Sequence, residues 1–237
     1  MNIVITGASK GIGFEMAKLF SNDENNTVVA IARSGQLLKE LKNACIRQNL
    51  KNKLKTIVFD LEETQSIQTI LIPEILKYVN TVDILINNAG VLINKPFHDF
   101  ELSEINKLIT VNFISHSILI KELIPYIESG FPKHVVSISS MGGFQGSSKF
   151  PGLSYYSAGK AALSNLTECL AEEYKNNGIK FNCLALGSVD TEMLRKAFPD
   201  YKSITTAADM AQFIVDFAMN GYKYFNGKII PVSSTTP

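Results

Sequence analysis

The sequence predicts an α/β fold in which a parallel sheet is covered by helices on both faces. Short apolar runs, typical of buried strands, alternate with amphipathic helical stretches from one end of the chain to the other. The first apolar run is followed at once by a glycine-rich turn at residues 7–13 and then by a helical stretch. Because crossovers between parallel strands are right-handed, this order predicts a doubly wound sheet whose ligands bind at the carboxyl ends of the strands.

Seven apolar runs are expected to form the strands of this sheet. They cover residues 2–6, 27–32, 55–59, 82–86, 134–139, 180–185 and 228–232. The expected helices begin near Phe14 and then cover residues 36–48, 66–78, 102–127, 156–176 and 206–219, with a short amphipathic piece at 193–198 of the kind that covers a pocket. Since no repeat, linker or change of composition interrupts the sequence, residues 1–237 are expected to form a single domain.

Charge and cysteine content exclude several classes of protein. The net charge of +1 offers no basic surface for nucleic acid. The three cysteines, Cys45, Cys169 and Cys183, are scattered and lack a CxxC spacing, so we expect buried, reduced thiols. The three histidines show no metal-ligand spacing. The sequence thus predicts neither a metal site nor a nucleic-acid partner.

Neither a signal peptide nor a membrane span is expected. The apolar residues after Met1 are too few for the apolar region of a signal peptide. The longest apolar stretch, residues 113–127, is interrupted by Lys121 and Glu122. We therefore expect a cytoplasmic protein without a membrane partner.

Polar and glycine residues gather where the expected strands end. Besides the glycine turn, Asp60, residues 87–90, Ser140 and residues 186–191 each follow a strand. Asp60 could be a solvated turn residue or accept a hydrogen bond from an adenine amino group, and the asparagines at 87–90 could form an ordinary turn or tie strands together under a cofactor. Because these strand ends meet at one edge of a parallel sheet, they are expected to form one site.

Tyr156 and Lys160 lie four residues apart in an expected helix, so their side chains share a face. A lysine ammonium beside a phenol lowers the phenol's pKa from about 10, and such a phenol can exchange a proton with a substrate oxygen near neutral pH. Ser140 could hydrogen-bond the same oxygen. The pair could also be a surface tyrosine packed against a lysine stem, but the convergence of the strand-end features favours the catalytic interpretation.

Two residues are unfavourable inside the expected helices. Asn112 lies in the middle of the helix at 102–127, where its amide competes for backbone groups. We expect it to have a local role, such as a kink or a bound water, or else to be exposed. Pro73 is expected to kink the helix at 66–78 or to mark a frayed turn.

Together these motifs resemble those of the short-chain dehydrogenase/reductase family over nearly the whole chain. The stretch Thr6-Gly7-x-x-x-Gly11-Ile12-Gly13 resembles the family's dinucleotide-binding turn, and Asn87-Asn88-Ala89-Gly90 matches its sheet-stabilising turn. Asn112, Ser140, Tyr156 and Lys160 match the positions of its active site in order and at nearly the usual spacing. The resemblance implies a Rossmann-like fold with about seven strands and a nicotinamide cofactor.

The resemblance also implies a role for each active-site residue. Tyr156 is the general acid in reduction and the general base in oxidation, and Ser140 polarises the substrate carbonyl. Lys160 binds the nicotinamide ribose and lowers the pKa of Tyr156, and Asn112 holds a water molecule that links Lys160 to solvent. The implied cofactor-binding residues are Gly7, Ser9, Lys10, Gly11, Ile12, Gly13, Arg33, Asp60, Leu61, Asn88, Ala89, Gly90, Tyr156, Lys160, Gly187, Val189 and Thr191.

The cofactor is expected to be NADP(H). An NAD site in this fold has a carboxylate at the end of the second strand, which would repel a 2′-phosphate. Here the strand ends with Ala32 followed by Arg33, whose planar guanidinium suits a phosphate, and Lys10 adds a second cation from the glycine turn. The alternative is that both are ordinary surface cations.

The predicted function is an NADP(H)-dependent carbonyl reductase or alcohol dehydrogenase that acts on a small-molecule substrate. The alternative is a 3-oxoacyl-thioester reductase that works with an acyl-carrier protein, for which Lys149 is the candidate basic contact. A non-catalytic cofactor-binding scaffold is a remote alternative. The resemblance implies a homodimer through the helices at 102–128 and 156–176, whereas residues 231–237 lack the ending common in family homotetramers.

Two departures from the family pattern fall near the expected substrate mouth. Leu186 stands where the family usually has a proline. The segment between Ser140 and Tyr156 is a few residues longer than usual, which inserts about residues 147–151.

Overall fold

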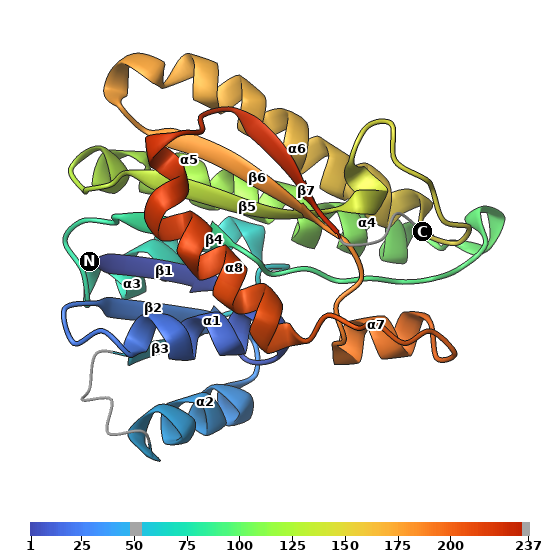
Figure 1. Cartoon of the computed structure of the whole chain (residues 1–237), viewed down its shortest axis with the longest axis horizontal. Coiled ribbons are helices and arrows are strands. Elements are labelled where there is room, and N and C mark those ends of the chain that lie inside the picture. Colours follow the sequence, from blue (N-terminus) through green and yellow to red (C-terminus); the bar gives the residue numbers. More distant parts are fainter. Residues whose placement is uncertain (48–53, 234–237) are drawn as a thin grey trace.

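The computed structural model describes residues 1–47 and 54–233. In this part of the chain, seven strands form one sheet in the order β3-β2-β1-β4-β5-β6-β7, and every neighbouring pair is parallel (Figure 1). The strands are β1 (Asn2–Thr6), β2 (Thr27–Ala32), β3 (Leu54–Val58), β4 (Ile84–Asn87), β5 (His134–Ser140), β6 (Lys180–Leu186) and β7 (Lys228–Val232). The predicted parallel, doubly wound sheet is confirmed, and the strand ends differ from the predicted ones by at most two residues.

The helices cover both faces of the sheet. They are α1 (Gly11–Ser21), α2 (Gly35–Arg47), α3 (Ile72–Leu76), α4 (Leu102–Ile109), α5 (Ser115–Glu128), α6 (Ser154–Glu173), α7 (Glu192–Ala197) and α8 (Ala207–Asn220). Short 3₁₀ turns lie at Thr64–Ser66, Phe97–Asp99, Met141–Gly143, Lys175–Asn177 and Gly221–Lys223. Helices α1, α2 and α8 pack on one face, and α3, α5 and α6 pack on the other (Figure 1).

The central strand β1 shows why the strands have continuous apolar sequences. Ile3 and Ile5 pack in the core under α1 and α8, whereas Val4, between them, packs in the core under α5. All three are fully buried. A strand that is covered on both faces needs an apolar side chain at every position, in contrast to the alternating pattern of a half-exposed strand.

The strand order creates a crevice at the carboxyl ends of the central strands β1 and β4. The chain moves from β1 outward to β3 and then returns to place β4 on the other side of β1. The connections after β1 and β4 therefore diverge to opposite sides, and ligands in this class of fold bind at that point. Figure 1 shows that the strands all point toward the end of the molecule where α7 lies.

Two of the expected helices contain a π-helical turn. The expected helix at 102–127 consists of α4, a π-helical turn at Thr110–Ile114 that contains Asn112, and α5. The expected helix at 66–78 contains a π-helical turn at Ile67–Leu71 before α3, and Pro73 lies in the first turn of α3, where its missing N–H costs little. A widened turn changes the direction of the helix surface, and such turns are frequent at functional sites.

Helix α2 ends at Arg47, and the last residue of the expected helix at 36–48 lies outside the described residues.

The expectation of buried cysteines is wrong for one residue. Cys45 and Cys183 are buried, but Cys169 is exposed, since it lies on the outer side of α6. All three are free thiols. The helical stretch Leu102–Glu128 is long and apolar enough to cross a membrane, but its inner residues, such as Leu119, are packed in the core.

Candidate active site

A cavity of about 420 Å³ lies at the carboxyl ends of the strands. Its walls come from the loops after β1 to β6, from the start of α6 and from α7. Of the residues predicted for the site, those that line the cavity are Gly7, Ser9, Lys10, Gly11, Ile12, Gly13, Arg33, Asp60, Leu61, Asn88, Ala89, Gly90, Ser140, Tyr156, Lys160, Gly187, Val189 and Thr191. The structure thus brings together residues that are far apart in the sequence. Asn112, the other predicted site residue, is buried behind the residues that line the cavity.

The glycine turn and the turn after β4 are joined by hydrogen bonds. The Thr6 hydroxyl accepts hydrogen bonds from the backbone N–H groups of Asn88 and Ala89, each at 3.0 Å, and the Asn88 amide donates to the carbonyl of Thr6 at 2.9 Å. Gly7 has a φ of +68°, and a Cβ there would lie 2.7 Å from the Cα of Ala89. Only glycine fits this position, which leaves the start of α1 open to an anionic ligand.

Asn112 holds the next part of the wall in place. From the π-helical turn, its amide donates to the carbonyls of Val91 and Leu108, both at 2.9 Å, and its oxygen accepts from the Val91 N–H at 3.1 Å. A Cβ on Gly90 would lie 3.0 Å from that oxygen and 3.4 Å from the Lys160 amine. Glycine at position 90 therefore leaves space between these two polar groups.

The Tyr156 phenol and the Ser140 hydroxyl both line the cavity, and they lie close enough for the hydroxyl to influence the phenol. Burial raises the pKa of Tyr156 above its ordinary value, and the Ser140 hydroxyl offsets part of this effect. The expected lowering of this pKa by Lys160 is therefore wrong for the protein without ligands, because the loss of solvent around the phenol outweighs the effect of its neighbours. The phenol is protonated at neutral pH.

Lys160 is 3% exposed, and its amine donates to the carbonyl of Ile138 at 2.8 Å. Burial lowers the pKa of Lys160 to about 8. The backbone of this helical turn is held to β5, since the Ser139 hydroxyl donates to the Lys160 carbonyl at 2.9 Å. Lys160 is thus anchored within the protein one helical turn from Tyr156.

The two predicted phosphate-binding cations differ in their surroundings. Arg33 is exposed at the end of β2 and lines the cavity. Lys10 also lines it, but its amine forms an ion pair of 2.9 Å with Glu192, the first residue of α7. A Cβ on Gly11 would lie 3.4 Å from the Thr191 methyl group, so the glycine turn and the start of α7 approach each other closely here. The ion pair crosses from one side of the cavity to the other.

Asp60 forms the turn that the sequence offered as one of two alternatives, and it also lies at the cavity. Its carboxylate accepts a hydrogen bond from the backbone N–H of Glu62 at 3.0 Å, which is the geometry of a turn residue. Asp60 also lines the cavity, next to Leu61. The turn uses one carboxylate oxygen of Asp60, so the other oxygen remains available at the cavity.

Sequence reasoning missed several residues of the cavity wall. Val91 and Leu92 directly follow the turn at 87–90, and Met141 directly follows Ser140, so their proximity to known motifs was the available signal. Glu192 and Tyr201 had no such signal, because their positions depend on how α7 and the segment after it fold over the sheet. The predicted cover of 193–198 does line the cavity through Met193, Leu194 and Phe198.

Comparison with known proteins identifies the family. A family model described as short chain dehydrogenase matches residues 1–202. The chain belongs to the short-chain dehydrogenase/reductase family. A ketoacyl reductase of Nostoc sp. is 29% identical over 222 residues, which cover 92% of this chain and 75% of that protein.

Solved structures of other short-chain dehydrogenases share the fold. A candidate NAD(P)-dependent gluconate 5-dehydrogenase from Beutenbergia cavernae, with bound NADP, has a TM-score of 0.85 and 26% identity, covering 98% of this chain and 94% of that one. A 3-ketoacyl-(acyl-carrier-protein) reductase from Brucella melitensis, complexed with NADH, has a TM-score of 0.84 and 20% identity, covering 98% of this chain and 96% of that one. These relatives differ in the substrate and in the cofactor that they are described with.

The residues of this short-chain dehydrogenase fit a nicotinamide dinucleotide. The glycine turn offers backbone at the start of α1, while a side chain at Gly7 would collide with Ala89 and one at Gly90 would lie against Asn112 and Lys160. The bound dinucleotide supplies hydride transfer. The protein supplies a protonated phenol at Tyr156, a hydroxyl at Ser140 and a buried amine at Lys160. No cluster of residues that could hold a metal ion occurs in residues 1–47 and 54–233.

Proposed function

We propose that this short-chain dehydrogenase is an NADP(H)-dependent oxidoreductase that interconverts a carbonyl and an alcohol, with reduction as the favoured direction at neutral pH. The observation that carries the proposal is that Ser140, Tyr156 and Lys160 line the same cavity as the glycine turn. The phenol donates a proton to the substrate oxygen in reduction and accepts it in oxidation. The Ser140 hydroxyl holds the same oxygen and polarises the carbonyl.

Lys160 and Asn112 act through position. The Lys160 ammonium lines the cavity and binds the ribose of the cofactor. When it does so, the amine turns away from the carbonyl of Ile138. Asn112 orients Val91 and presents its oxygen beside the Lys160 amine, where a water molecule can connect the two. The remaining predicted cofactor residues bind the dinucleotide along the carboxyl ends of β1, β2, β3, β4 and β6.

NADP(H) is proposed as the cofactor because of the charges at the end of β2. Ala32 precedes Arg33, so the described end of β2 has no carboxylate to repel a 2′-phosphate, and Arg33 faces the cavity without an ion pair among the described residues. Lys10 supplies the second cation, in competition with Glu192. One relative is described with NADP and another with NADH, so the preference rests on these side chains.

A 3-oxoacyl-thioester reductase is the second candidate, because two of the similar proteins are ketoacyl reductases. An acyl-carrier partner is acidic and needs basic residues at the entrance. Lys149 does not serve this well, since its amine donates to the carbonyl of Phe144 at 2.6 Å and to the Ser147 hydroxyl at 3.1 Å within its own loop. A carbonyl reductase that acts on free small molecules is therefore preferred.

The proposal extends to the organisation of the protein. Residues 1–237 act as a single dinucleotide-binding and catalytic domain in the cytoplasm. Two copies associate as a homodimer through the outer sides of α4, α5 and α6, where Leu102 is 71% exposed and Ile114 is 38% exposed. A homotetramer is the alternative assembly, and the mass of the protein in solution distinguishes the two.

The decisive experiment measures NADPH and NADH oxidation by the purified protein against a panel of ketones, aldehydes and 3-oxoacyl thioesters. The expected result is turnover of free carbonyl compounds with a higher kcat/KM for NADPH. A preference for thioesters that increases when they are carried on an acyl-carrier protein would support the second candidate. Tight NADPH binding without turnover of any carbonyl would instead indicate a cofactor-binding scaffold.

A further inference from the structure

The cavity has two ends with different chemistry. The carboxyl ends of β1, β2 and β3 form one end, which contains the glycine turn, Arg33 and Asp60, and we call it the dinucleotide end. The carboxyl ends of β4, β5 and β6 form the other, which we call the substrate end because a carbonyl that reacts with Tyr156 and Ser140 must lie there. The loop at 91–95, the loop at 144–153, which contains the inserted residues, and the segment at 191–201 cover the substrate end.

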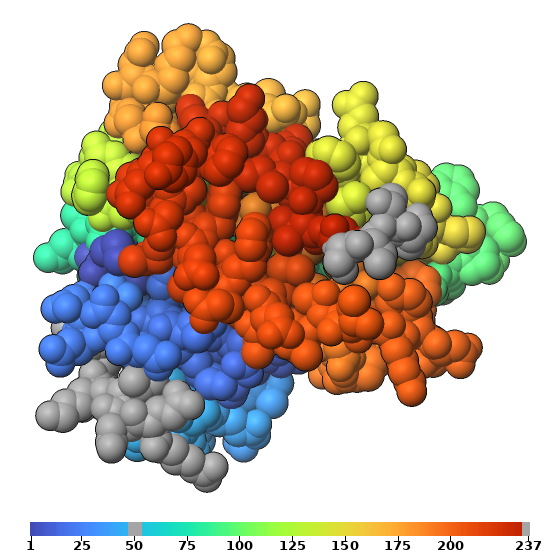
Figure 2. Space-filling view, viewed as in Figure 1, coloured from blue at the N-terminus to red at the C-terminus, as the bar shows by residue number. Residues whose placement is uncertain are grey.

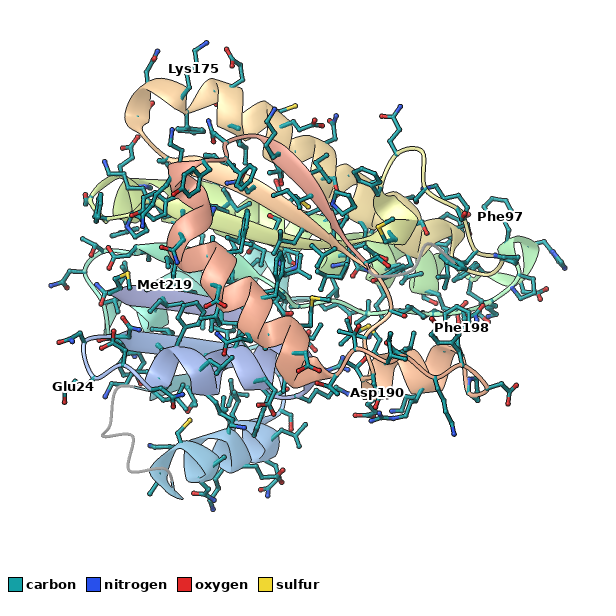
Figure 3. The ribbon with its side chains drawn as sticks, in the orientation of Figure 1. Glu24, Phe97, Lys175, Asp190, Phe198 and Met219 are labelled. Carbon is teal, nitrogen blue, oxygen red and sulfur yellow. The ribbon has the colours of Figure 1, made fainter. Side chains whose placement is uncertain are left out.

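Apolar side chains line the substrate end from every covering segment. Leu92, Met141, Phe150, Leu153, Met193 and Phe198 all face the cavity. Figure 3 shows Phe198 beside α7 at the same end of the molecule as Phe97, far from Glu24 and Lys175. In the space-filling view, the orange segment that contains α7 and the green segment near residue 97 form the surface at this end (Figure 2).

The covering segments use their polar groups on one another. The Asn94 amide donates to the carbonyl of Ala197 at 2.8 Å, which joins the loop at 91–95 to α7. The backbone N–H of Lys95 donates to the carbonyl of Gly152 at 3.0 Å, which joins the same loop to the loop at 144–153. The Tyr201 hydroxyl is hydrogen-bonded to Ser188 at 3.0 Å. These pairings leave mainly apolar groups to meet a substrate.

The described cations that line the cavity lie away from the substrate end or are buried. Among the described residues that line the cavity, the cations are Lys10, Arg33 and Lys160. Lys10 and Arg33 belong to the dinucleotide end, and Lys160 is buried beneath Tyr156. The carboxylate of Glu192 is bound by Lys10 and, at 2.6 Å, by Lys196. A carboxylate or phosphate on the substrate would lose its water here without gaining a partner.

We propose that the substrate is an uncharged ketone with apolar flanking groups, and that Phe150, Met193 and Phe198 determine its specificity. In the reaction, the carbonyl carbon accepts a hydride from NADPH, the oxygen accepts the proton of Tyr156, and the C=O double bond becomes a secondary alcohol while NADP⁺ is formed. The inference rests on the proposed function. Each methylene that enters an apolar pocket changes kcat/KM by about tenfold, so the preferred ketones are those whose flanks fill this end.

The test compares two methyl ketones of the same shape that differ in charge. 5-Methyl-2-hexanone ends in an isopropyl group, where 4-oxopentanoate ends in a carboxylate. We expect kcat/KM with NADPH to be higher for the neutral ketone by at least about tenfold. Equal values, or a preference for 4-oxopentanoate, would overturn the inference.

A charge substitution sharpens the test. Phe150→Lys places an ammonium in the wall of the substrate end, and it should raise the ratio of kcat/KM for 4-oxopentanoate to that for the neutral ketone by about tenfold or more. The matched control is Phe97→Lys, because Phe97 is 65% exposed and lines a neighbouring hollow instead of this cavity. A ratio that stays unchanged in Phe150→Lys, or that changes equally in both variants, would show that this wall does not contact the substrate.

A binding measurement separates this inference from the proposed function. Calorimetric titration of both ketones into the Tyr156→Phe protein saturated with NADPH reports recognition without turnover. Stronger binding of the neutral ketone supports the substrate class even if the wild-type protein proves to be catalytically inactive. Stronger binding of 4-oxopentanoate would refute the substrate class even if the protein is an active carbonyl reductase.

Discussion

The two ends of the cavity are built in different ways. The dinucleotide end consists of short, continuous motifs whose backbone approaches the ligand, such as the glycine turn held against Ala89. The substrate end consists of side chains from segments far apart in the sequence, joined by contacts such as that between Asn94 and Ala197, which are 103 residues apart. A motif is sufficient where the backbone forms the site, whereas folding is needed where side chains from separate loops form it.

The largest effect is expected at Tyr156, where the two ends meet. Tyr156→Phe removes the proton donor but retains the ring, so kcat should fall by about 10²–10⁴-fold while the Kd for NADPH stays nearly unchanged. Tyr155→Phe is the matched control, because Tyr155 stacks on Phe97 and does not line the cavity. Retention of more than about a third of the wild-type turnover, with chemistry rate-limiting, would contradict the role of Tyr156 as the acid.

The pH dependence should reveal the raised pKa of Tyr156. Because burial keeps the phenol protonated at neutral pH, alcohol oxidation, which needs the phenolate, should rise by about tenfold per pH unit from neutral pH upward. Ketone reduction needs the protonated phenol and should be constant at neutral pH and decline in the alkaline range. Since the Ser140 hydroxyl lowers this pKa, Ser140→Ala should move the oxidation profile to higher pH. A profile that moves to lower pH would disprove this assignment.

At the dinucleotide end, Arg33→Ala should weaken NADPH binding by about tenfold or more, because a hydrogen bond to a charged group contributes about 1.5–3 kcal/mol. NADH lacks the 2′-phosphate, so its Kd should hardly change and serves as the internal control. Ala32→Asp, which introduces the carboxylate of an NAD site, should reverse the preference. Fluorescence titration of both cofactors measures the effect, and an equal loss of affinity for both would mean that Arg33 does not bind the phosphate.

The smallest effect is expected at the ion pair that crosses the cavity. Glu192→Gln releases Lys10, which can then bind the 2′-phosphate, so the affinity for NADPH should rise by about two- to fivefold, as expected for exposed charges. Asp190→Asn is the control, because Asp190 pairs with Arg195 and not with Lys10. If Glu192→Gln changes NADPH and NADH binding by the same factor, the ion pair closes the cavity but does not affect the choice of cofactor.

The sheet was predictable because its signals are local. Buried parallel strands such as β1 are continuous apolar runs, and the helices between them have a regular apolar face. The π-helical turn at Asn112 was not predictable, because five residues are too few to show a repeat of their own within a longer α-helical pattern. The unfavourable asparagine indicated a local role, and the structure adds that its amide holds Val91.

The fold class, the family resemblance and the candidate residues of the dinucleotide end and of the reacting centre follow from the amino-acid sequence, because they depend on short motifs in a regular order. Three properties of the site arise only from the folded chain. Folding raises the pKa of Tyr156, since burial depends on the surrounding chain; it pairs Lys10 with Glu192; and it makes the substrate end apolar. Each of these results from contacts between distant segments, whose energies no local pattern contains.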